Sequence, residues 1–341
     1  MNLFILTCLK YVTIPREVKD MKMFVYSLRE YDERRFFDNI CGELGIEYDS
    51  TPDVPTPENI GLAEGFDVIN IITCPIDEER IKALKEAGVK LIMSRTVGTD
   101  HIDKDAAARY GIPVMGISYS PNAVADYAIM LMLMGCRRLK YIQLRTIGRD
   151  YGLYGRLGKE LRECTVGLYG GGDIGKTVAR QLSGFGCRIL ICDRHPDEET
   201  SGYAEYVDRD ILLSESDIIS LHLSGTPENF HIIGEKEFSM MKDGVMIINT
   251  ARGLLIDTKA MIDAIESGKI GFAGLDVIEN EKGMYYFDHE DRILTNKDFS
   301  ILNGYPNVIV LPHMAFYTEP AVRDMVVNST VAAKKFFDRE N

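Results

Sequence analysis

Three glycines occur at the spacing G-x-G-x-x-G: Gly170, Gly172 and Gly175. An apolar segment at 166–169 precedes them, an amphipathic run follows, and a second apolar segment at 189–192 leads to Asp193. This order predicts strand, turn, helix and strand. In such a unit the first glycine permits the tight turn, the second lets backbone amides approach a pyrophosphate, and the third lets the helix pack on the strand. The pattern therefore predicts a site for a nicotinamide or flavin dinucleotide, with its phosphates at a helix N-terminus.

The acid at the end of the second strand indicates which dinucleotide binds. The carboxylate of Asp193 can accept hydrogen bonds from an adenosine ribose 2′-hydroxyl, and it would repel a 2′-phosphate. Arg194 stands beside it and weakens that preference. We therefore expect NAD as the cofactor, in preference to NADP.

The size and the charge of the chain limit its class. Its 341 residues, 45% of them hydrophobic, suffice for two globular domains with separate cores. The formal net charge of -13 at pH 7 disfavours nucleic acid and anionic membrane surfaces as partners, because their phosphates would be repelled. An anionic substrate must therefore meet a local basic pocket.

The cysteines lack C-x-x-C or metal-ligand spacing, and several lie in apolar runs: residues 8, 41, 74, 136, 164, 187 and 192. They are typical of reduced core residues in a cytoplasmic protein, and they predict no metal site. No apolar run reaches the length of a membrane span, and the densest one, 128–134, is predicted to form a buried or subunit-interface helix. Residues 1–20 have neither the leading positive charge nor the cleavage pattern of a signal peptide. We expect them to form an N-terminal extension ahead of a fold that begins at Met21.

Strand-like and helix-like segments alternate along the chain, which is typical of α/β folds. Residues 21–121 are predicted to contain strands at 24–26, 67–72 and 91–94 and helices at 32–44 and 78–87. A turn at 118–122 then leads into a long helix and a second domain. Six strands are predicted there, in a doubly wound parallel Rossmann sheet: 166–169, 189–192, 218–221, 245–249, 272–277 and 308–311.

The last amphipathic stretch, 320–337, follows the sixth strand of a completed sheet, so we expect it to return to the first domain. This interpretation places an NAD-binding Rossmann domain at 122–317. It is inserted into a smaller flavodoxin-like α/β substrate domain, formed by 21–121 and 318–341.

Reactive side chains follow three neighbouring strands of the second domain. Arg252 follows the fourth strand, Glu279 and Glu281 follow the fifth, and His313 follows the sixth. Ligands of open α/β sheets bind at these carboxyl ends. Arg252 can hold a carboxylate through two hydrogen bonds and polarise the adjacent carbonyl. These residue types predict a site that binds and reduces an anionic carbonyl compound.

His313 is predicted to be the proton donor, because imidazole titrates near neutral pH. Either Glu281 or Glu279 is expected to hydrogen-bond the ring and favour its protonated form. His222 also follows a strand and is expected to be structural or to line the cofactor. The other histidines are predicted to lie in loops or on the surface without a supporting acid: His101, His195, His231 and His289.

From about Met21 onward, the sequence resembles the D-isomer-specific 2-hydroxyacid dehydrogenases, and within them the D-lactate dehydrogenases of lactobacilli and of vancomycin-resistance operons. Seven ordered motifs carry the resemblance: Leu28 to Glu30, Ser94 to Asp100, Tyr119 to Ala123, Thr165 to Gly167 with the glycine loop, Asn249 to Gly253, Leu275 to Val277, and Pro312 to Thr318. The resemblance implies an NAD-dependent oxidoreductase of small 2-hydroxy acids.

The resemblance implies a catalytic triad of Arg252, Glu281 and His313, since the family's acid is the second in its E-x-E motif. It implies that the cofactor is lined by the following residues: Gly170, Gly172, Asp173, Ile174, Gly175, Asp193, Leu223, Ser224, Asn229, Thr250, Ala251 and Asp276.

The resemblance also implies the substrate pocket and the assembly. The backbone of Val97 and Gly98 is implied to meet the substrate carboxylate, with three side chains around the pocket: Tyr119, Arg29 and Phe316. A homodimer is implied through the helix after Asn122. Ile71-Ile72-Thr73-Cys74 replaces an aromatic residue and a glutamine of the lactobacillal enzymes, so the pocket for the substrate side chain is expected to differ.

We predict that NADH reduces a 2-oxo acid, pyruvate, to D-lactate, with His313 as the general acid. The first alternative is a broader D-2-hydroxyacid dehydrogenase of the 2-hydroxyisocaproate type. The second is a non-catalytic NADH-sensing module, like the corepressors that share this fold.

Overall fold

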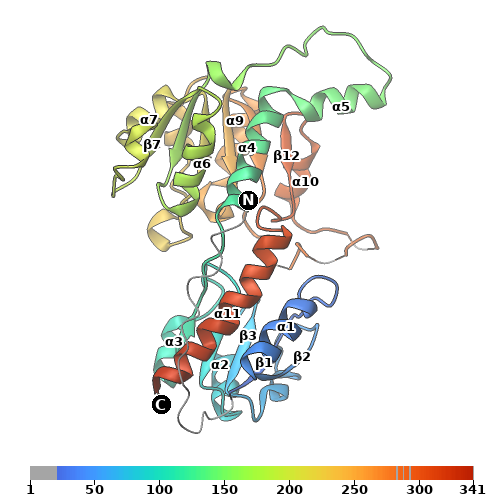
Figure 1. The fold of residues 1–341 in the computed structure, drawn as a ribbon. Helices are drawn as coiled ribbons and strands as arrows, with labels where there is room; N and C mark the ends of the chain where they lie inside the picture. Colours follow the sequence, from blue (N-terminus) through green and yellow to red (C-terminus); the bar gives the residue numbers. More distant parts are fainter. Residues whose placement is uncertain (1–20, 282, 287, 292, 341) are drawn as a thin grey trace, which may run out of the picture. The chain divides into compact units, whose positions relative to one another are not determined.

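The computed structural model describes residues 21–281, 283–286, 288–291 and 293–340. The predicted N-terminal extension, 1–20, lies outside the described residues. The chain forms two compact units (Figure 1). Unit 1 contains the described residues up to Ser118 and from Met325 onward, and unit 2 contains Tyr119–Asp324. The chain thus crosses between the units twice, after Ser118 and after Asp324.

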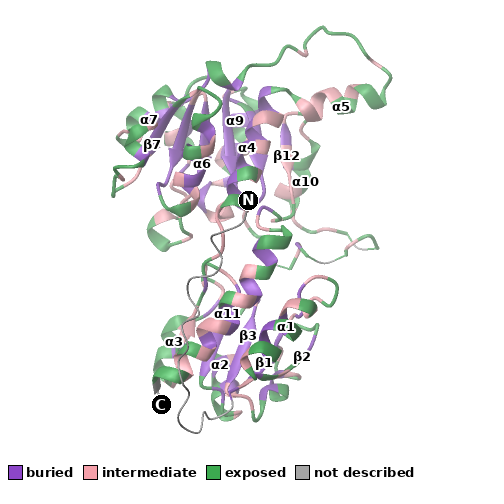
Figure 2. Cartoon of the chain, viewed as in Figure 1, coloured by how far each residue is buried: buried purple, intermediate pink, exposed green. Residues whose placement is uncertain are grey.

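Unit 1 is built on a parallel five-stranded sheet in the order β2-β1-β3-β4-β5. Its strands are β1 (Lys22–Val25), β2 (Glu47–Ser50), β3 (Val68–Ile71), β4 (Leu91–Ser94) and β5 (Val114–Met115). Its helices are α1 (Arg34–Leu44), the 3-10 turn η1 (Ile60–Ala63), α2 (Glu78–Glu86) and α3 (Lys104–Tyr110). All residues of β3 and β4 are buried, as expected for central strands of a parallel sheet covered on both faces (Figure 2).

Two strands of unit 1 were not predicted from the sequence. β2 reads Glu-Tyr-Asp-Ser and lies at the edge of the sheet with no buried residue. β5 has only two residues. A polar edge strand and a very short strand carry no apolar run, so the hydrophobic pattern does not reveal them.

Unit 2 is built on a parallel seven-stranded sheet in the order β12-β11-β10-β9-β6-β7-β8. The strands are β6 (Thr165–Tyr169), β7 (Arg188–Cys192), β8 (Glu205–Tyr206), β9 (Ile218–Leu221), β10 (Val245–Asn249), β11 (Ile270–Leu275) and β12 (Val308–Val310). The prediction of six strands was therefore wrong by one. β8 pairs only with β7 at the edge, and its two residues are too few to show a periodic pattern.

The following helices and 3-10 turns connect these strands: α4 (Asn122–Cys136), α5 (Leu139–Ile147), η2 (Leu161–Glu163), α6 (Asp173–Ser183), η3 (Thr200–Gly202), α7 (Arg209–Glu215), η4 (Pro227–Asn229), α8 (Glu235–Met240), η5 (Gly253–Leu255), α9 (Thr258–Glu266) and α10 (Lys297–Gly304). Apolar clusters cover both faces of the sheet, with α4 and α6 in one and α8 and α9 in the other. The sheet is thus doubly wound, as the glycine fingerprint predicts.

The last helix, α11 (Glu319–Glu340), begins in unit 2 and ends in unit 1. In unit 1 it is attached through Ser329, whose Oγ accepts a hydrogen bond from Nδ2 of Asn70 at 2.9 Å. Among the described residues, no helix has both the length and the apolar character needed to cross a bilayer. The described part of the chain also contains no cluster of three or more His, Cys, Asp or Glu side chains suited to a metal ion.

Candidate active site

The glycine turn between β6 and α6 has the geometry that the three-glycine spacing requires. Gly170 has φ of +109°, and a Cβ added there would lie 2.5 Å from the carbonyl oxygen of His222. A Cβ on Gly175 would lie 2.1 Å from the carbonyl oxygen of Gly170. Any side chain at either position would therefore displace the turn.

The residues at this turn fit a dinucleotide. Gly172 is the N-cap of α6, no side chain caps this end, and a Cβ there would meet no atom within 4 Å. The first amides of α6 therefore border open space, where the helix dipole favours a phosphate. Asp173 and Ile174 follow as the first residues of α6.

Asp193 lies at the end of β7, directly beside the glycine turn. Its carboxylate accepts hydrogen bonds from the N–H groups of Gly171, at 2.6 Å, and of His195, at 2.8 Å. Burial opposes the charged form, but these N–H donors outweigh it and lower the pKa of Asp193. The residue is therefore ionised at neutral pH, which is the state that discriminates against a 2′-phosphate.

The remaining predicted cofactor residues follow β9, β10 and β11. Leu223 and Ser224 follow β9, and Nδ2 of Asn229 donates to the carbonyl of Ser224 at 2.9 Å. Thr250 and Ala251 follow β10, and Asp276 follows β11.

Three of the buried polar atoms that have no hydrogen-bond partner in the described part of the chain lie at or near these strand ends. They are Oγ of Ser220, Nε2 of His222 and Oγ1 of Thr250. Burial lowers the pKa of His222 to about 4, so its ring is neutral at pH 7. Buried polar atoms are normally satisfied, so this group of atoms fits a ligand site along the strand ends.

The strand register brings the three predicted catalytic residues to one edge of the sheet. Asn249 of β10 is level with Leu275 of β11, and Leu275 is level with Val310 of β12. Arg252 and His313 each lie three residues beyond their aligned strand positions. Parallel strands end at the same edge, so the loops that carry them lie side by side.

Glu281 is the acid that contacts His313, the predicted proton donor. Its Oε1 lies 2.7 Å from Nδ1 of His313, and both side chains are about four-fifths buried. Its Oε2 accepts a hydrogen bond from the N–H of Ile278 at 3.0 Å, which fixes the carboxylate. The contact therefore orients the imidazole.

The backbone of His313 is held in an unusual conformation. Its φ is +55°, which is uncommon for a residue with a side chain. The carboxylate of Asp276 accepts the N–H groups of Met314, at 2.9 Å, and of Ala315, at 2.8 Å, while Oη of Tyr286 donates to the carbonyl of His313 at 2.8 Å. Burial raises the pKa of Asp276, and the two N–H donors oppose that shift. Asp276, predicted to line the cofactor, therefore also fixes the histidine turn.

Arg252 lies near Tyr119, a predicted substrate-pocket residue that the structure places in unit 2 and not in the first domain. Burial raises the pKa of Tyr119, and the positive charge of Arg252 opposes the shift. Nη1 of Arg252 donates to the carbonyl of Ala251 at 2.7 Å. Phe316 follows His313 and packs edge-on against Tyr286, with ring centroids 6.4 Å apart. Tyr286 was not identified from the sequence, because it lies far from any strand end or motif.

Glu279, the alternative acid, pairs with a different histidine. Its Oε1 lies 2.7 Å from Nε2 of His231, and its Oε2 accepts from both the N–H and the hydroxyl of Thr258 at 3.0 and 2.6 Å. The prediction that His231 has no supporting acid was therefore wrong. The two residues are 48 positions apart in the chain, so only the packing of the β9 and β11 loops brings them together.

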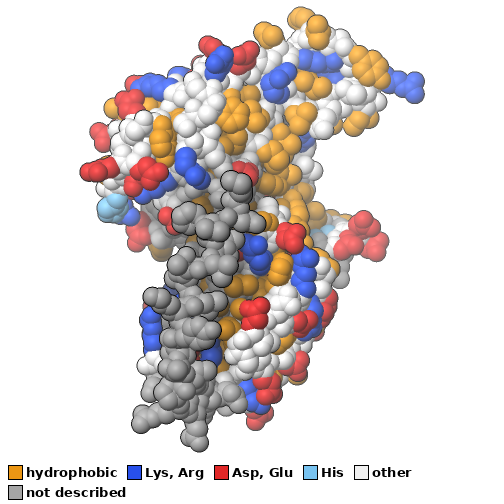
Figure 3. All heavy atoms as spheres, in the orientation of Figure 1, with side chains coloured by type: hydrophobic (Ala, Val, Ile, Leu, Met, Phe, Trp, Pro, Cys, Tyr) orange, Lys and Arg blue, Asp and Glu red, His pale blue; other side chains and the backbone are white. Residues whose placement is uncertain are grey.

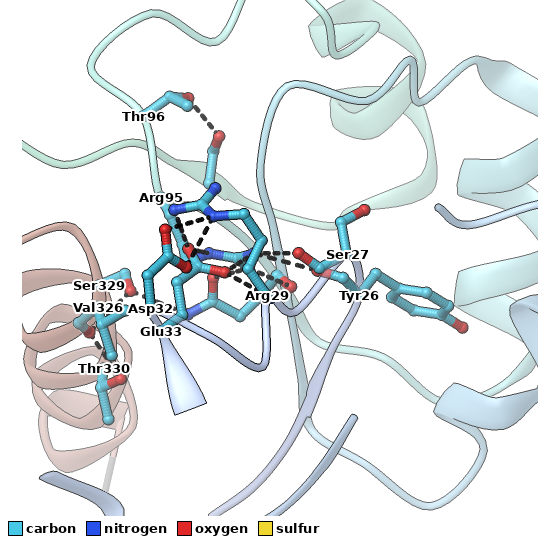
Figure 4. A network of polar contacts seen from close by, with 12 residues as sticks. Tyr26, Ser27, Arg29, Asp32, Glu33, Arg95, Thr96, Val326, Ser329 and Thr330 are labelled. Atoms are coloured by element: carbon cyan, nitrogen blue, oxygen red, sulfur yellow. Dashed lines mark hydrogen bonds and ion pairs between the residues drawn. The ribbon is translucent and has the colours of Figure 1, made fainter. Parts of the chain in front are cut away.

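The other predicted substrate residues belong to unit 1. Arg29 lies in the turn after β1, where its Nε donates to Oδ1 of Asp32 at 2.9 Å (Figure 4). Val97 and Gly98 follow β4, and the Val97 side chain is exposed. The carbonyl of Gly98 accepts a hydrogen bond from Oγ1 of Thr96 at 2.6 Å, which closes the loop on itself.

Comparison with known proteins decides the family. Residues 129–315 match the family described as "D-isomer specific 2-hydroxyacid dehydrogenase, NAD binding domain". The chain belongs to this family. Within it, the chain is 40% identical to a D-specific alpha-keto acid dehydrogenase of Enterococcus faecalis over 307 residues, which cover 90% of this chain and 94% of that protein.

The names of two further relatives of this 2-hydroxyacid dehydrogenase refer to different substrates. An aromatic 2-oxoacid reductase of Clostridium sporogenes is 38% identical over 321 residues, covering 93% of this chain and 96% of that protein. The crystal structure of a D-lactate dehydrogenase from Treponema pallidum superposes with a TM-score of 0.85 at 33% identity, covering 94% of this chain and 98% of that one. The protein is therefore an NAD-dependent D-2-hydroxyacid dehydrogenase with a Rossmann domain.

Proposed function

We propose that this D-2-hydroxyacid dehydrogenase is a D-lactate dehydrogenase that reduces pyruvate. The contact that carries the proposal is the 2.7 Å approach of Glu281 to Nδ1 of His313. It leaves the other ring nitrogen, Nε2, to donate a proton to the substrate oxygen. NADH supplies the hydride that reduces the carbonyl carbon.

The chain's own residues bind the substrate and move the proton. The Arg252 guanidinium holds the substrate carboxylate and polarises the adjacent carbonyl. His313 gives its Nε2 proton to the oxygen as negative charge develops there. Glu281 holds the ring in place through its contact with Nδ1. In unit 1, the backbone N–H groups of Val97 and Gly98 are the proposed contacts for a substrate carboxylate.

The alternative is a dehydrogenase of bulkier 2-oxo acids. The aromatic 2-oxoacid reductase among the relatives supports it. Residues 71–74 also support it, because they lack the aromatic residue and the glutamine that the lactobacillal enzymes have there.

One assay separates these functions. NADH oxidation is measured in parallel with pyruvate, 2-oxoisocaproate and phenylpyruvate, and the products are analysed by chiral chromatography. We expect the highest kcat/KM with pyruvate, and D-lactate as the product. A preference for the two bulky acids would support the alternative, whereas tight NADH binding without turnover would support the sensor.

We also infer that the protein is a homodimer assembled through α4. Within unit 2, apolar side chains of α4 line an open groove of about 760 Å³, among them Ile129, Met130, Leu133 and Met134. Figure 3 shows hydrophobic side chains gathered along α4 and α5. An exposed apolar groove of this kind is typical of a subunit interface.

A further inference from the structure

A fully buried ion pair lies at the centre of unit 1. The side chains of Arg95 and Glu33 are both 0% exposed. Nε of Arg95 lies 3.1 Å from Oε1 of Glu33, and Nη2 lies 3.3 Å from Oε2 (Figure 4). The guanidinium also lies over the ring of Phe37, 5.6 Å from its centroid. Two charges this deep are costly to bury unless their geometry is closely satisfied.

The Arg95 guanidinium joins the ends of three adjacent strands. Arg95 directly follows β4, and its Nη1 donates to the backbone carbonyl and to Oδ1 of Asn70 on β3, both at 3.1 Å. Its Nη2 donates to the carbonyls of Tyr26 and Ser27, at the end of β1, at 3.2 and 3.1 Å. A single planar group thus fixes the carboxyl edge of the sheet across β4, β3 and β1.

Glu33 extends this network to the predicted substrate residue Arg29. Glu33 is the N-cap residue of α1, yet its side chain does not cap that helix. Its Oε2 instead accepts the N–H of Arg29 at 3.0 Å, and its Oε1 lies 3.2 Å from Nη2 of Arg29. The turn that carries Arg29 is therefore bound to the same carboxylate that pairs with Arg95.

The second substrate-facing segment begins one residue after Arg95. Thr96, Val97 and Gly98 follow it directly, and the carbonyl of Thr96 accepts the N–H of Ile117 at 3.0 Å. One residue spans at most about 3.6 Å, so the position of Arg95 largely sets where this loop starts. The same network reaches α11 through Asn70, whose Nδ2 donates to Ser329.

We propose that Arg95 and Glu33 are positioning residues, whose ion pair holds the Arg29 turn and the Thr96–Gly98 loop in the fixed relation that binds the substrate carboxylate. The proposal rests on the proposed function, in which both segments face the substrate. Apolar side chains could fill this volume without loss of stability. The ion pair contributes what they cannot, namely N–H donors in fixed directions toward Tyr26, Ser27 and Asn70.

The test is the variant Arg95→Lys, which keeps the buried positive charge but cannot reach all these acceptors at once. We expect KM for pyruvate to rise at least tenfold, while the dissociation constant for NADH, which binds in unit 2, stays within twofold of the parent. Glu33→Gln keeps the volume and is expected to act in the same direction. A folded Arg95→Lys enzyme with parental KM would overturn the proposal.

Hydrogen–deuterium exchange gives a readout that needs no turnover. Peptides covering 26–34 and 94–101 are expected to exchange at least fivefold faster in Arg95→Lys or in Glu33→Gln, with β3 and β4 still protected. Unchanged exchange in both segments would also overturn the proposal. A parent without activity on any 2-oxo acid would instead refute the proposed function, and the exchange data would still decide the role of the ion pair.

Lys90→Met is the matched control. It removes the ion pair between Nζ of Lys90 and Oδ1 of Asp67, which lie 2.7 Å apart. This pair lies at the amino ends of β3 and β4, whereas Arg95 lies at the carboxyl end of β4. We expect parental KM and parental exchange in both segments. If Lys90→Met raised KM as much as Arg95→Lys, the effect would reflect general loosening of unit 1, and the positioning role would be wrong.

Discussion

Nδ1 of His313 lies 2.7 Å from Oε1 of Glu281, although the two residues are 32 positions apart in the chain. The contact fixes which nitrogen of the ring faces the acid and which remains for the substrate. The backbone of His313 has a positive φ. The N–H groups of the next two residues, Met314 and Ala315, donate hydrogen bonds to the carboxylate of Asp276 and fix this turn.

Replacing Glu281 by Gln is expected to lower kcat/KM for reduction, because the imidazole of His313 loses the carboxylate that fixes its orientation. We expect a loss of about 100-fold, within the range of general acid catalysis. Steady-state kinetics of NADH oxidation with pyruvate test this. A variant with parental kcat/KM would contradict the role, and Glu237→Gln, which removes a carboxylate at the start of α8, is the control.

Asp193→Asn is expected to weaken the preference for NADH over NADPH. The amide can still accept the N–H of Gly171, but it no longer repels a 2′-phosphate. We expect the ratio of kcat/KM values for NADPH and NADH to rise by about tenfold or more, equivalent to about 1.4 kcal/mol. Steady-state kinetics with both cofactors measure the ratio. An unchanged ratio would show that Asp193 does not set the preference.

Glu279→Gln is expected to destabilise the fold at neutral pH but not at low pH. Burial alone would raise the pKa of Glu279, but hydrogen bonds from Thr258 and His231 outweigh it and lower the pKa. A carboxyl with a lowered pKa stabilises the folded state above its unfolded pKa, and this contribution is lost as the pH falls through the folded value.

The free energy of unfolding of Glu279→Gln is therefore expected to be about 2 kcal/mol below the parent at pH 7, for the loss of hydrogen bonds to a charged group. The difference should shrink as the pH falls below about 4.3, the ordinary value for glutamate. Urea unfolding at pH 7, 5 and 3.5 measures it. A difference that stays constant down to pH 3.5 would mean that the charge of Glu279 is not the cause.

Met134→Glu is expected to dissociate the homodimer. The substitution places a charge in the apolar groove of α4, where burial against a second copy would be costly. Light scattering should give twice the chain mass of 38.4 kDa for the parent and the single mass for the variant. Val54→Glu adds the same charge at an exposed apolar residue of unit 1 and should leave the dimer intact. A parent that is already monomeric would refute the dimer.

The sequence alone predicted the class of fold and most of the long elements. Residues 91–93 and 245–248 are continuous apolar runs, and both belong to fully buried strands. The glycine spacing predicted the turn at Gly170, because only a residue without a side chain fits there. Short edge strands such as β8 were missed, because burial and alternation are what make a strand visible in a sequence.

The partners of the charged side chains were decided by the tertiary structure. Glu279 and Glu281 are both glutamates and lie two positions apart. Residue type and position alone therefore left both as candidates for the carboxylate that contacts His313. In the structure they contact two different histidines, His231 and His313. The ion pair between Arg95 and Glu33 was not foreseen either, since 62 positions separate them. Local propensity and periodicity act over a few residues, whereas these contacts depend on strand order and loop packing, which only the assembled sheet determines.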